Sequence, residues 1–436
     1  MNRRVASLAL AAVACSGSPT PSQTSPSSSP ARTVQWVPED TRPARNAVLI
    51  VLDTTRDDAT RAAHTPTLDA LTAEGTRVDR AWSGGTWTVP SVVSLLTGQF
   101  VRHHGWDLPS ARMGKYPPLP DVPRLPEVLQ KQGVKTSALY ANPYLSEPLG
   151  FDRGFDSWKR TSDAHMAKQL EKLVSSSWTR TDRHFAYLHL LGPHSPLKPS
   201  DAARERWEVD AQWFSGKHGF MVGEAKRNQK DGVRAAYKAA YHAVIEDTDA
   251  LVGALLAALG PHRKDTLVIV TSDHGELLGE HGQAGHGWWL YEELTRVPFV
   301  VDHPFAAGDV ESLPSILSNV SVADLITRGM GIEAEWPVTL SDAPLLAAKR
   351  DGREAVAFDG VHKVVWDERI TGNSPIEYHL DADPGEASPI AASADRVARL
   401  DTLQQRFPVS RLELVEPQPV DPDTMKDLET LGYVDR

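Results

Sequence analysis

Two short, wholly apolar segments limit the possible folds of this chain more than any other feature. Residues 47–52 (AVLIVL) and 267–270 (LVIV) carry no polar side chain. A strand is apolar at every position only where both of its faces are covered, as in a parallel sheet between helices. The first segment is followed by Asp53, and the second, after a short step, by Asp273 and His274. Ligands of open α/β sheets bind at the carboxyl ends of the strands, so these polar residues mark a candidate site.

The rest of the chain has the pattern of alternating helices and strands. A helix is predicted over about 235–259, because apolar residues recur there every three or four positions. We expect its acidic residues to lie mostly on the solvated face: Glu246, Asp247 and Asp249. Further strands are predicted at 136–140, 185–191 and 297–301. This alternation favours a doubly wound α/β sheet.

The first residues have the features of an export signal. Two arginines precede an apolar run over 5–13, which is too short to span a bilayer, and Ala14 and Cys15 follow it. The pattern resembles a bacterial lipoprotein signal peptide, residues 1–15, with cleavage before Cys15 and lipid on its sulfur; a plain signal peptide is the alternative. Residues 16–44 are rich in Ser, Pro and Thr, which predicts a disordered tether. We therefore expect an exported protein, anchored to the membrane of the bacterial cell envelope through Cys15.

Composition narrows the choice of partners. Cys15 is the only cysteine, so the mature chain has no internal disulfide. The formal net charge of −11 is spread along the chain, which argues against nucleic-acid binding through a basic face. An anionic substrate is still compatible with this charge, because a bound metal ion inverts the local field. Carboxylates with an imidazole suit Mn²⁺, Zn²⁺ or Mg²⁺, although an aspartate after a strand can also be a simple helix cap.

Thr88 stands two residues before Pro90 in TWTVPSVVSLLTGQ, residues 86–99. Proline is common at the start of a helix, and the apolar run after it has helical spacing, so a helix is predicted from near Pro90. Such a helix points its positive end at an oxyanion, and a divalent metal favours the alkoxide of a threonine hydroxyl. From the residues alone, Thr88 is either an ordinary hydroxyl in a turn or a nucleophile.

Six segments occur in an order that resembles the sulfatase family of the alkaline phosphatase superfamily. They are LDTTRDD, HTPTLDALTAEGTR, TWTVPSVVSLLTGQFVRHHG, LHLLGPHSPLKP, TSDHGELLGEHG and HGWWLYEELTRVPFVV. HKVVWDE, EYHLDADPGEAS and LETLGYV resemble the closing segments of the same family. The resemblance implies an α/β fold with a mostly parallel sheet sandwiched by helices, and a small C-terminal α+β subdomain. It places the catalytic domain at 45–345 and the C-terminal subdomain and tail at 346–436.

The resemblance gives Thr88 a chemically important position. Sulfatases carry Cys/Ser-x-Pro-Ser-Arg, whose first residue becomes formylglycine, whereas this chain has Thr88 first and Val92 last. Threonine cannot become formylglycine. The resemblance therefore implies the chemistry of the superfamily's phosphoryl-transfer branches, in which a threonine bound to a metal attacks directly.

The resemblance also implies the ligands of one divalent metal ion, which would be Mn, Zn, Ca or Mg: Asp53, Thr88, Asp273 and His274. Thr54 stands where calcium sulfatases have a second aspartate, which favours Mn or Zn. No Asp-x-x-x-His occurs in the sequence, so the second metal of the two-zinc relatives is not expected. Arg56 and Asp57 are expected to form supporting pairs beside Asp53.

Four histidines match segments of the family. His194 in GPHSP and His286 in GHGWW stand where relatives contact the transferred group, and we expect either to bind an oxygen or to act as a general acid. His104 and His281 are expected to be structural.

These observations lead to one hypothesis and two alternatives. The hypothesis is a metal-dependent hydrolase of sulfate or phosphate esters, phosphodiesters included, with Thr88 as nucleophile. Its substrates would be esters of small molecules, glycans or lipids. The alternatives are a transferase that moves phosphoglycerol or phosphoethanolamine groups, and a non-catalytic binding lipoprotein on the same scaffold.

Overall fold

The computed structural model describes eleven stretches of the chain: 42–106, 115–116, 119–213, 231–304, 313–342, 344–348, 353–357, 359–366, 374–409, 418–419 and 422–430. The signal peptide and nearly all of the tether predicted for residues 1–44 lie outside the described residues. Within the described stretches, no helix combines the length and apolar character needed to cross a membrane.

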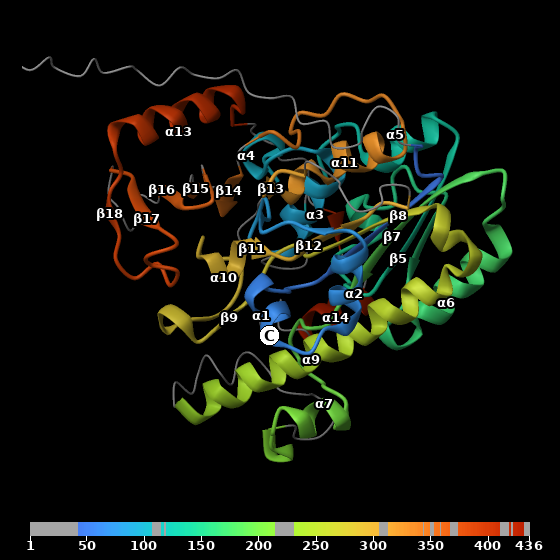
Figure 1. Ribbon diagram of the computed structural model, residues 1–436, viewed down its shortest axis with the longest axis horizontal. Helices are drawn as coiled ribbons and strands as arrows, with labels where there is room; N and C mark the ends of the chain where they lie inside the picture. The colour runs from blue at the N-terminus through green and yellow to red at the C-terminus, as the bar shows by residue number, and fades with distance from the viewer. Residues whose placement is uncertain are drawn as a thin grey trace, which may run out of the picture. The chain divides into compact units, whose positions relative to one another are not determined.

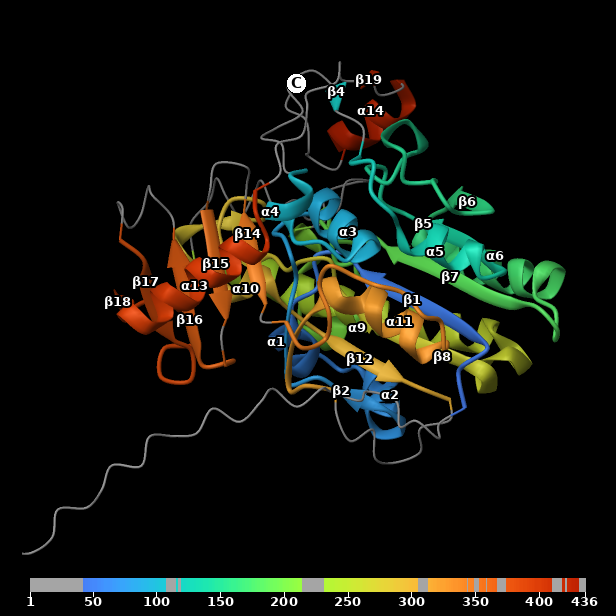
Figure 2. The same ribbon diagram turned by 90° about the horizontal axis from the view of Figure 1, so that it is seen from above.

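A seven-stranded sheet forms the centre of the described structure, and Figure 2 shows its strands in order. That order is β2 (Thr76–Arg77), β12 (Phe299–Asp302), β8 (Thr266–Thr271), β1 (Asn46–Leu52), β7 (Arg183–Leu190), β5 (Val134–Tyr140) and β6 (Ser157–Arg160). The five strands from β8 to β6 are parallel, whereas β12 runs antiparallel to both β8 and β2. The predicted mostly parallel sheet is confirmed.

The side chains of β1 explain why this strand lies at the middle of the sheet. All seven residues are buried, and the six apolar ones that follow Asn46 alternate between two separate apolar clusters. Leu49 and Val51 face one cluster, whereas Ile50 and Leu52 face the other, as the two-residue period of a strand requires. Full burial of each such side chain contributes about 1.5–3 kcal/mol. A strand with this sequence is therefore stable only where helices cover both faces of the sheet.

Two sets of helices provide that cover. The Leu49 face packs against α3 (Thr88–Thr97), α5 (Leu125–Lys131) and α11 (Val322–Gly329). The Ile50 face packs against α2 (Pro66–Glu74), α6 (Asp163–Ser177) and α9 (Asp231–Ala258). Figure 1 shows α6 and α9 side by side. Several further elements of this part are short: α1 (Asp57–Ala62), α4 (Val101–His104), β4 (Lys115–Tyr116), α7 (Asp201–Arg206), β9 (Leu277–Leu278), β10 (Ala284–Gly285), β19 (Gln418–Pro419) and α14 (Pro422–Thr430).

The single strand predicted at 297–301 is wrong. Pro298 divides this segment into β11 (Arg296–Val297) and β12. β11 pairs with β3 (Arg80–Trp82) in a small sheet that also contains β13 (Ile316–Ser318), whereas β12 joins the central sheet. Proline has no N–H to donate and fixes its own φ, so the ladder breaks at this residue.

The expected solvated position of Asp249 is also wrong. α9 forms as predicted, but the Asp249 carboxylate is buried and accepts the backbone N–H groups of Thr67 and Leu68, each at 2.9 Å. These N–H groups belong to the first turn of α2, where a carboxylate satisfies unpaired donors and the positive end of the helix. Periodicity within α9 cannot reveal this partner, because α2 lies far away in the sequence.

A small C-terminal α+β subdomain is present, as expected. Its antiparallel sheet contains β14 (Leu345–Ala348), β15 (Arg353–Ala357), β16 (His362–Trp366), β17 (Ile376–His379) and β18 (Ile390–Ala391), with α13 (Ala394–Arg406) alongside. Lys363 of β16 is buried and binds Glu386 at 3.0 Å and Glu292 at 2.9 Å. Because Glu292 begins α10 (Glu292–Thr295), this buried ion triad ties the subdomain to the main part of the chain.

Candidate active site

The four predicted ligands meet at the carboxyl edge of the central sheet. Asp53 directly follows β1, and Asp273 and His274 follow the neighbouring strand β8. In the register of these strands Val51 lies beside Thr271, so the residues two positions later, Asp53 and Asp273, leave the sheet together. Thr88 is the first residue of α3 rather than part of a turn before it. All four side chains are fully buried.

The donor atoms of these residues converge on one point. Nε2 of His274 lies 3.4 Å from Oγ1 of Thr88, 3.7 Å from Oδ1 of Asp53 and 3.5 Å from Oδ2 of Asp273. One donor atom from each of Asp53, Asp273 and His274 lies within 4.8 Å of the others, a spacing at which one ion can bind all three.

The unpartnered oxygens of the two carboxylates show that a cation fits. Oδ1 of Asp53 and Oδ2 of Asp273 are buried without a hydrogen-bond partner in the described structure, and both lie close to His274 Nε2. Buried polar atoms are rarely left unsatisfied, because each one costs about 1–3 kcal/mol. A divalent ion would satisfy both oxygens, and the combination of carboxylate and imidazole suits manganese or zinc.

Burial and the charges of neighbouring groups shift the pKa values of Asp53, Asp273 and His274. Burial, together with the nearby charge of Asp53, raises the pKa of Asp273 well above its usual value. Burial would also raise the pKa of Asp53, but the hydrogen bond from His189 and the neighbouring histidines lower it overall. Burial and the nearby His286 lower the pKa of His274 to about 3, so its ring is neutral. Its Nδ1 donates to the Gly275 carbonyl at 2.9 Å, which leaves the lone pair on Nε2 directed at the carboxylates.

His194 and His286 border this cluster. The ring centroid of His286 lies 4.6 Å from that of His274 and 5.3 Å from that of His194. His286 contacts the Glu276 carboxylate through Nδ1 at 3.2 Å, and His194 donates from Nδ1 to the Ser195 carbonyl at 2.5 Å. Burial lowers the pKa of His194. The structure therefore brings together all six residues that the sequence marked as candidates.

Comparison with known proteins identifies the family. The sequence profile of the Sulfatase family matches residues 45–328. This chain belongs to the sulfatase family. Its curated relatives include the low-salt glycan biosynthesis sulfotransferase Agl7 of Haloferax volcanii, which is 28% identical over 258 residues, 57% of this chain and 53% of that protein. Arylsulfatase K of Rattus norvegicus is 22% identical over 386 residues, 74% of this chain and 66% of that protein. The chain thus spans about half the length of the Haloferax volcanii relative.

Solved structures have the same fold. A 2-O GAG sulfatase has a TM-score of 0.66 at 17% identity, over 88% of this chain and 96% of its own. The phosphonate monoester hydrolase of Agrobacterium radiobacter has a TM-score of 0.63 at 18% identity, over 87% of this chain and 100% of its own.

Two residues that support Asp53 were missed by the sequence analysis. Oδ2 of Asp53 accepts hydrogen bonds from Asn142 Nδ2 at 2.5 Å and from His189 Nε2 at 3.1 Å. His189 of β7 lies beside Val51 of β1 on one side and Tyr140 of β5 on the other, and Asn142 follows Tyr140 by two residues. The sequence does place these two polar residues near the carboxyl ends of two predicted strands. That is the edge of the sheet at which Asp53 was also predicted to lie.

The Tyr187 hydroxyl sets the tautomer of His189. It lies 2.8 Å from Nδ1 of His189, and the acceptor on the other side of the ring is the Asp53 carboxylate, so Tyr187 donates to Nδ1 and Nε2 carries the proton. We expect Tyr187→Phe to weaken Mn²⁺ binding, by less than the cost of about 10–100-fold for losing a direct partner of a metal ligand, because Tyr187 acts on Asp53 only through His189. Isothermal titration with Mn²⁺ measures this effect. Tyr140→Phe, which changes a tyrosine stacked on Trp158, is the matched control; equal affinities for the two variants would contradict the assignment.

Other residues named from the sequence lie outside this cluster. His104 contacts Ser94 at 3.0 Å and accepts the Trp106 N–H, and His281 stacks on Tyr291, so both have packing partners as expected.

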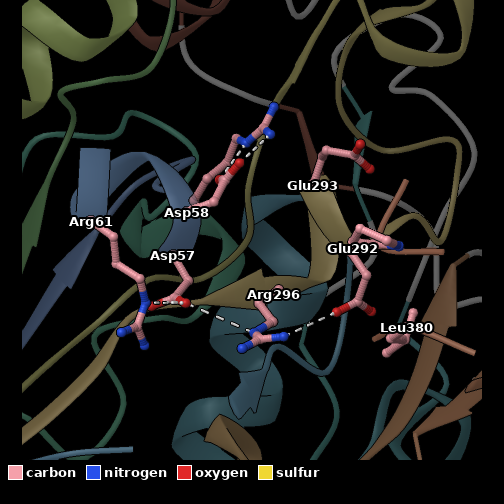
Figure 3. Close-up of a pocket in the computed structure, with 9 residues that line it drawn as sticks. Asp57, Asp58, Arg61, Glu292, Glu293, Arg296 and Leu380 are labelled. Atoms are coloured by element: carbon pink, nitrogen blue, oxygen red, sulfur yellow. Dashed lines mark hydrogen bonds and ion pairs between the residues drawn. The ribbon is translucent and has the colours of Figure 1, made fainter. Parts of the chain in front are cut away.

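Arg56 and Asp57 do not support Asp53 as expected. Arg56 pairs with Asp58 and Glu280, and Asp57 pairs with arginines. Arg56 and Asp57 instead line a separate cavity of about 300 Å³. Figure 3 shows Arg296 of this cavity between Asp57 and Glu292. The partners of Arg56 lie on α1 and just after β9, whereas those of Asp57 lie on α1, β2 and β11.

Proposed function

We propose that this chain is a metal-dependent hydrolase of sulfate or phosphate esters in which Thr88 is the nucleophile. The observation that carries the proposal is the position of Thr88 Oγ1, 3.4 Å from the His274 nitrogen around which two unpartnered carboxylate oxygens gather. A divalent cation bound there supplies positive charge that favours the alkoxide form of a neighbouring hydroxyl. We infer a single ion, with manganese or zinc favoured by the ligand set.

The reaction proceeds in two balanced steps. Oγ1 of Thr88 attacks the sulfur or phosphorus atom, and its hydroxyl proton passes to a neutral histidine of the site. The bond from the sulfur or phosphorus atom to the alcohol oxygen breaks and the histidine gives the proton to this oxygen, which leaves an ester on Thr88 and releases the alcohol. Water then attacks the same sulfur or phosphorus atom and breaks its bond to Oγ1, and a proton of this water passes to Oγ1. This restores Thr88 and releases sulfate, phosphate or, from a diester, a phosphate monoester. Thr88 begins α3, so the backbone N–H groups of Thr88 and Val89 stand at the positive end of this helix and are candidates to bind the oxygens of the transferred group.

His194 and His286 are the candidates for the proton donor. Both rings lie within 5.3 Å of a neighbouring histidine ring of the site, and imidazole transfers protons near neutral pH. One of them would protonate the leaving alcohol while the other binds an oxygen of the transferred group. The sequence pattern and these contacts fit either histidine in either role.

The substrate class is proposed from the relatives. The names of the similar proteins refer to glycan biosynthesis, a 2-O GAG sulfatase and a phosphonate monoester hydrolase. We infer that sugar sulfates or phosphate-type esters are the substrates, met at the bacterial cell envelope if Cys15 carries lipid.

A panel of esters tests the proposal. The purified chain is loaded with Mn²⁺ or Zn²⁺ and given p-nitrophenyl sulfate, p-nitrophenyl phosphate and bis-p-nitrophenyl phosphate, with and without glycerol as acceptor. We expect release of p-nitrophenol from at least one ester and loss of this activity on chelation. The second product should be sulfate, phosphate or, from the diester, p-nitrophenyl phosphate. Transfer to glycerol in preference to water would favour the transferase alternative, and metal binding without turnover would favour the binding lipoprotein.

A further inference from the structure

Asn142 lies between the proposed nucleophile and a proposed metal ligand. Its Nδ2 is 2.5 Å from Oδ2 of Asp53 and 3.4 Å from Oγ1 of Thr88. The side chain is fully buried at the end of β5, two residues after Tyr140. Asn142 thus reaches the reacting oxygen from the end of β5, whereas Asp53 and Asp273 follow β1 and β8.

The backbone sets the direction in which the Asn142 amide faces. Oδ1 of Asn142 accepts the N–H of Tyr144 at 2.9 Å. A backbone N–H can only donate, so the oxygen end of the amide is the end that faces Tyr144. The NH₂ end must then face Asp53 and Thr88, and it has two hydrogens, one for each of these acceptors.

The charge on Thr88 Oγ1 changes during the proposed reaction, and an N–H donor responds to that change. A hydroxyl oxygen is a modest acceptor, whereas an oxygen that carries negative charge forms shorter hydrogen bonds of roughly twice the strength. The separation of 3.4 Å is long for such a bond in the resting site, and catalytic hydrogen bonds often tighten only in the reacting complex. Donation to Oγ1 would therefore favour the transition state over the resting enzyme, which is the requirement for catalysis.

We propose that Asn142 is a catalytic residue that donates one amide hydrogen to Asp53 and the other to Oγ1 of Thr88. It stabilises negative charge on Oγ1 as the oxygen attacks, and again as the same oxygen leaves sulfur or phosphorus in the second step. Its donors carry no formal charge, so the amide does this without altering the net charge around Asp53 and Asp273. This role rests on the proposed function, because it requires Thr88 to be the nucleophile.

Asn142→Asp is the sharpest test, because it separates the two ends of the amide. The variant keeps the size of the side chain and the acceptor for the Tyr144 N–H, but it replaces the NH₂ donors by an oxygen. We expect kcat at saturating Mn²⁺ to fall about 10²–10³-fold, the usual cost of losing one donor to a developing oxyanion. Asn142→Ala removes the donors without adding an acid, and we expect a fall in kcat of the same order.

The matched control is Asn46→Asp at the opposite end of β1. Asn46 is also buried, its Oδ1 accepts a backbone N–H, that of His184 at 3.0 Å, and its Nδ2 faces the Thr266 hydroxyl. The chemical change is the same, but Asn46 lies away from the carboxyl edge where Thr88 stands. We expect kcat of this variant to match that of the wild type.

Metal dependence separates a catalytic role from a structural one. If Asn142 only oriented Asp53, its loss would weaken Mn²⁺ binding in a titration, and excess Mn²⁺ would restore kcat. Restored kcat at saturating Mn²⁺, or an unchanged kcat in both Asn142 variants, would overturn the proposal. The proposed function itself fails in a different way, through an inactive wild type or a fully active Thr88→Ala enzyme.

Discussion

Replacement of Thr88 by alanine is expected to lower kcat by about a thousandfold or more, because the atom that forms the covalent intermediate is removed. Thr88 Oγ1 is buried beside His274 Nε2, and alanine has no oxygen at this place to form the ester. We expect Mn²⁺ to bind the variant still, because Asp53, Asp273 and His274 stay intact. Steady-state kinetics with the preferred p-nitrophenyl ester and titration calorimetry measure the two properties.

Thr88→Ser is the matched control for this prediction. Serine keeps the hydroxyl and loses only a methyl group, so we expect its kcat to lie within roughly tenfold of the wild type. A Thr88→Ala enzyme that turns over as fast as Thr88→Ser would show that this oxygen is not the nucleophile.

Replacement of Asp273 by asparagine is expected to abolish metal binding and activity, yet to stabilise the metal-free protein. In the absence of metal, two buried carboxylates face each other, and burial with the charge of Asp53 raises the pKa of Asp273. Asparagine has the same shape and no charge, and its amide can donate toward Asp53. Burial disfavours the ionised form of Asp273, and a neutral amide of the same shape avoids that cost. We therefore expect a Tm several degrees above that of the wild type, measured by calorimetry after chelation.

Metal addition should reverse this order of stability. The wild type gains about 2.7 kcal/mol when free Mn²⁺ is a hundred times its Kd, whereas the Asp273→Asn variant gains nothing.

Asp249→Asn provides the contrast for Asp273. The two carboxylate oxygens of Asp249 each accept one backbone N–H of α2, and asparagine has only one acceptor oxygen for these two donors, so Asp249→Asn should lower Tm by a similar amount with and without metal. A metal-dependent gain in Tm that survives in Asp273→Asn would contradict the assignment of this ligand.

The parts of the site that depend on local sequence could be predicted. β1 and β8 are apolar at almost every position, which indicates burial on both faces, and the polar residues that follow them must lie at the carboxyl edge. Asp53, Asp273 and His274 were found in this way. Thr88 and the two outer histidines needed the resemblance to a family, because a single hydroxyl or imidazole has no distinctive local pattern.

The remaining parts depend on which elements become neighbours. His189 and Asn142 contact Asp53 only because β7 lies between β1 and β5. The spacing of residues along the chain does not reveal this order of strands in the sheet. Asp249 faces α2 for a similar reason, since its partners lie 182 and 181 residues away. The break at Pro298, by contrast, follows from local chemistry, because a missing N–H cannot continue a ladder.

Anomalous X-ray diffraction from crystals grown with Mn²⁺ would locate the cation itself. We expect one strong peak in contact with Oδ1 of Asp53, Oδ2 of Asp273, Nε2 of His274 and Oγ1 of Thr88. A peak elsewhere, or a peak here with the Thr88 hydroxyl turned away, would contradict a mechanism in which one divalent ion activates this threonine.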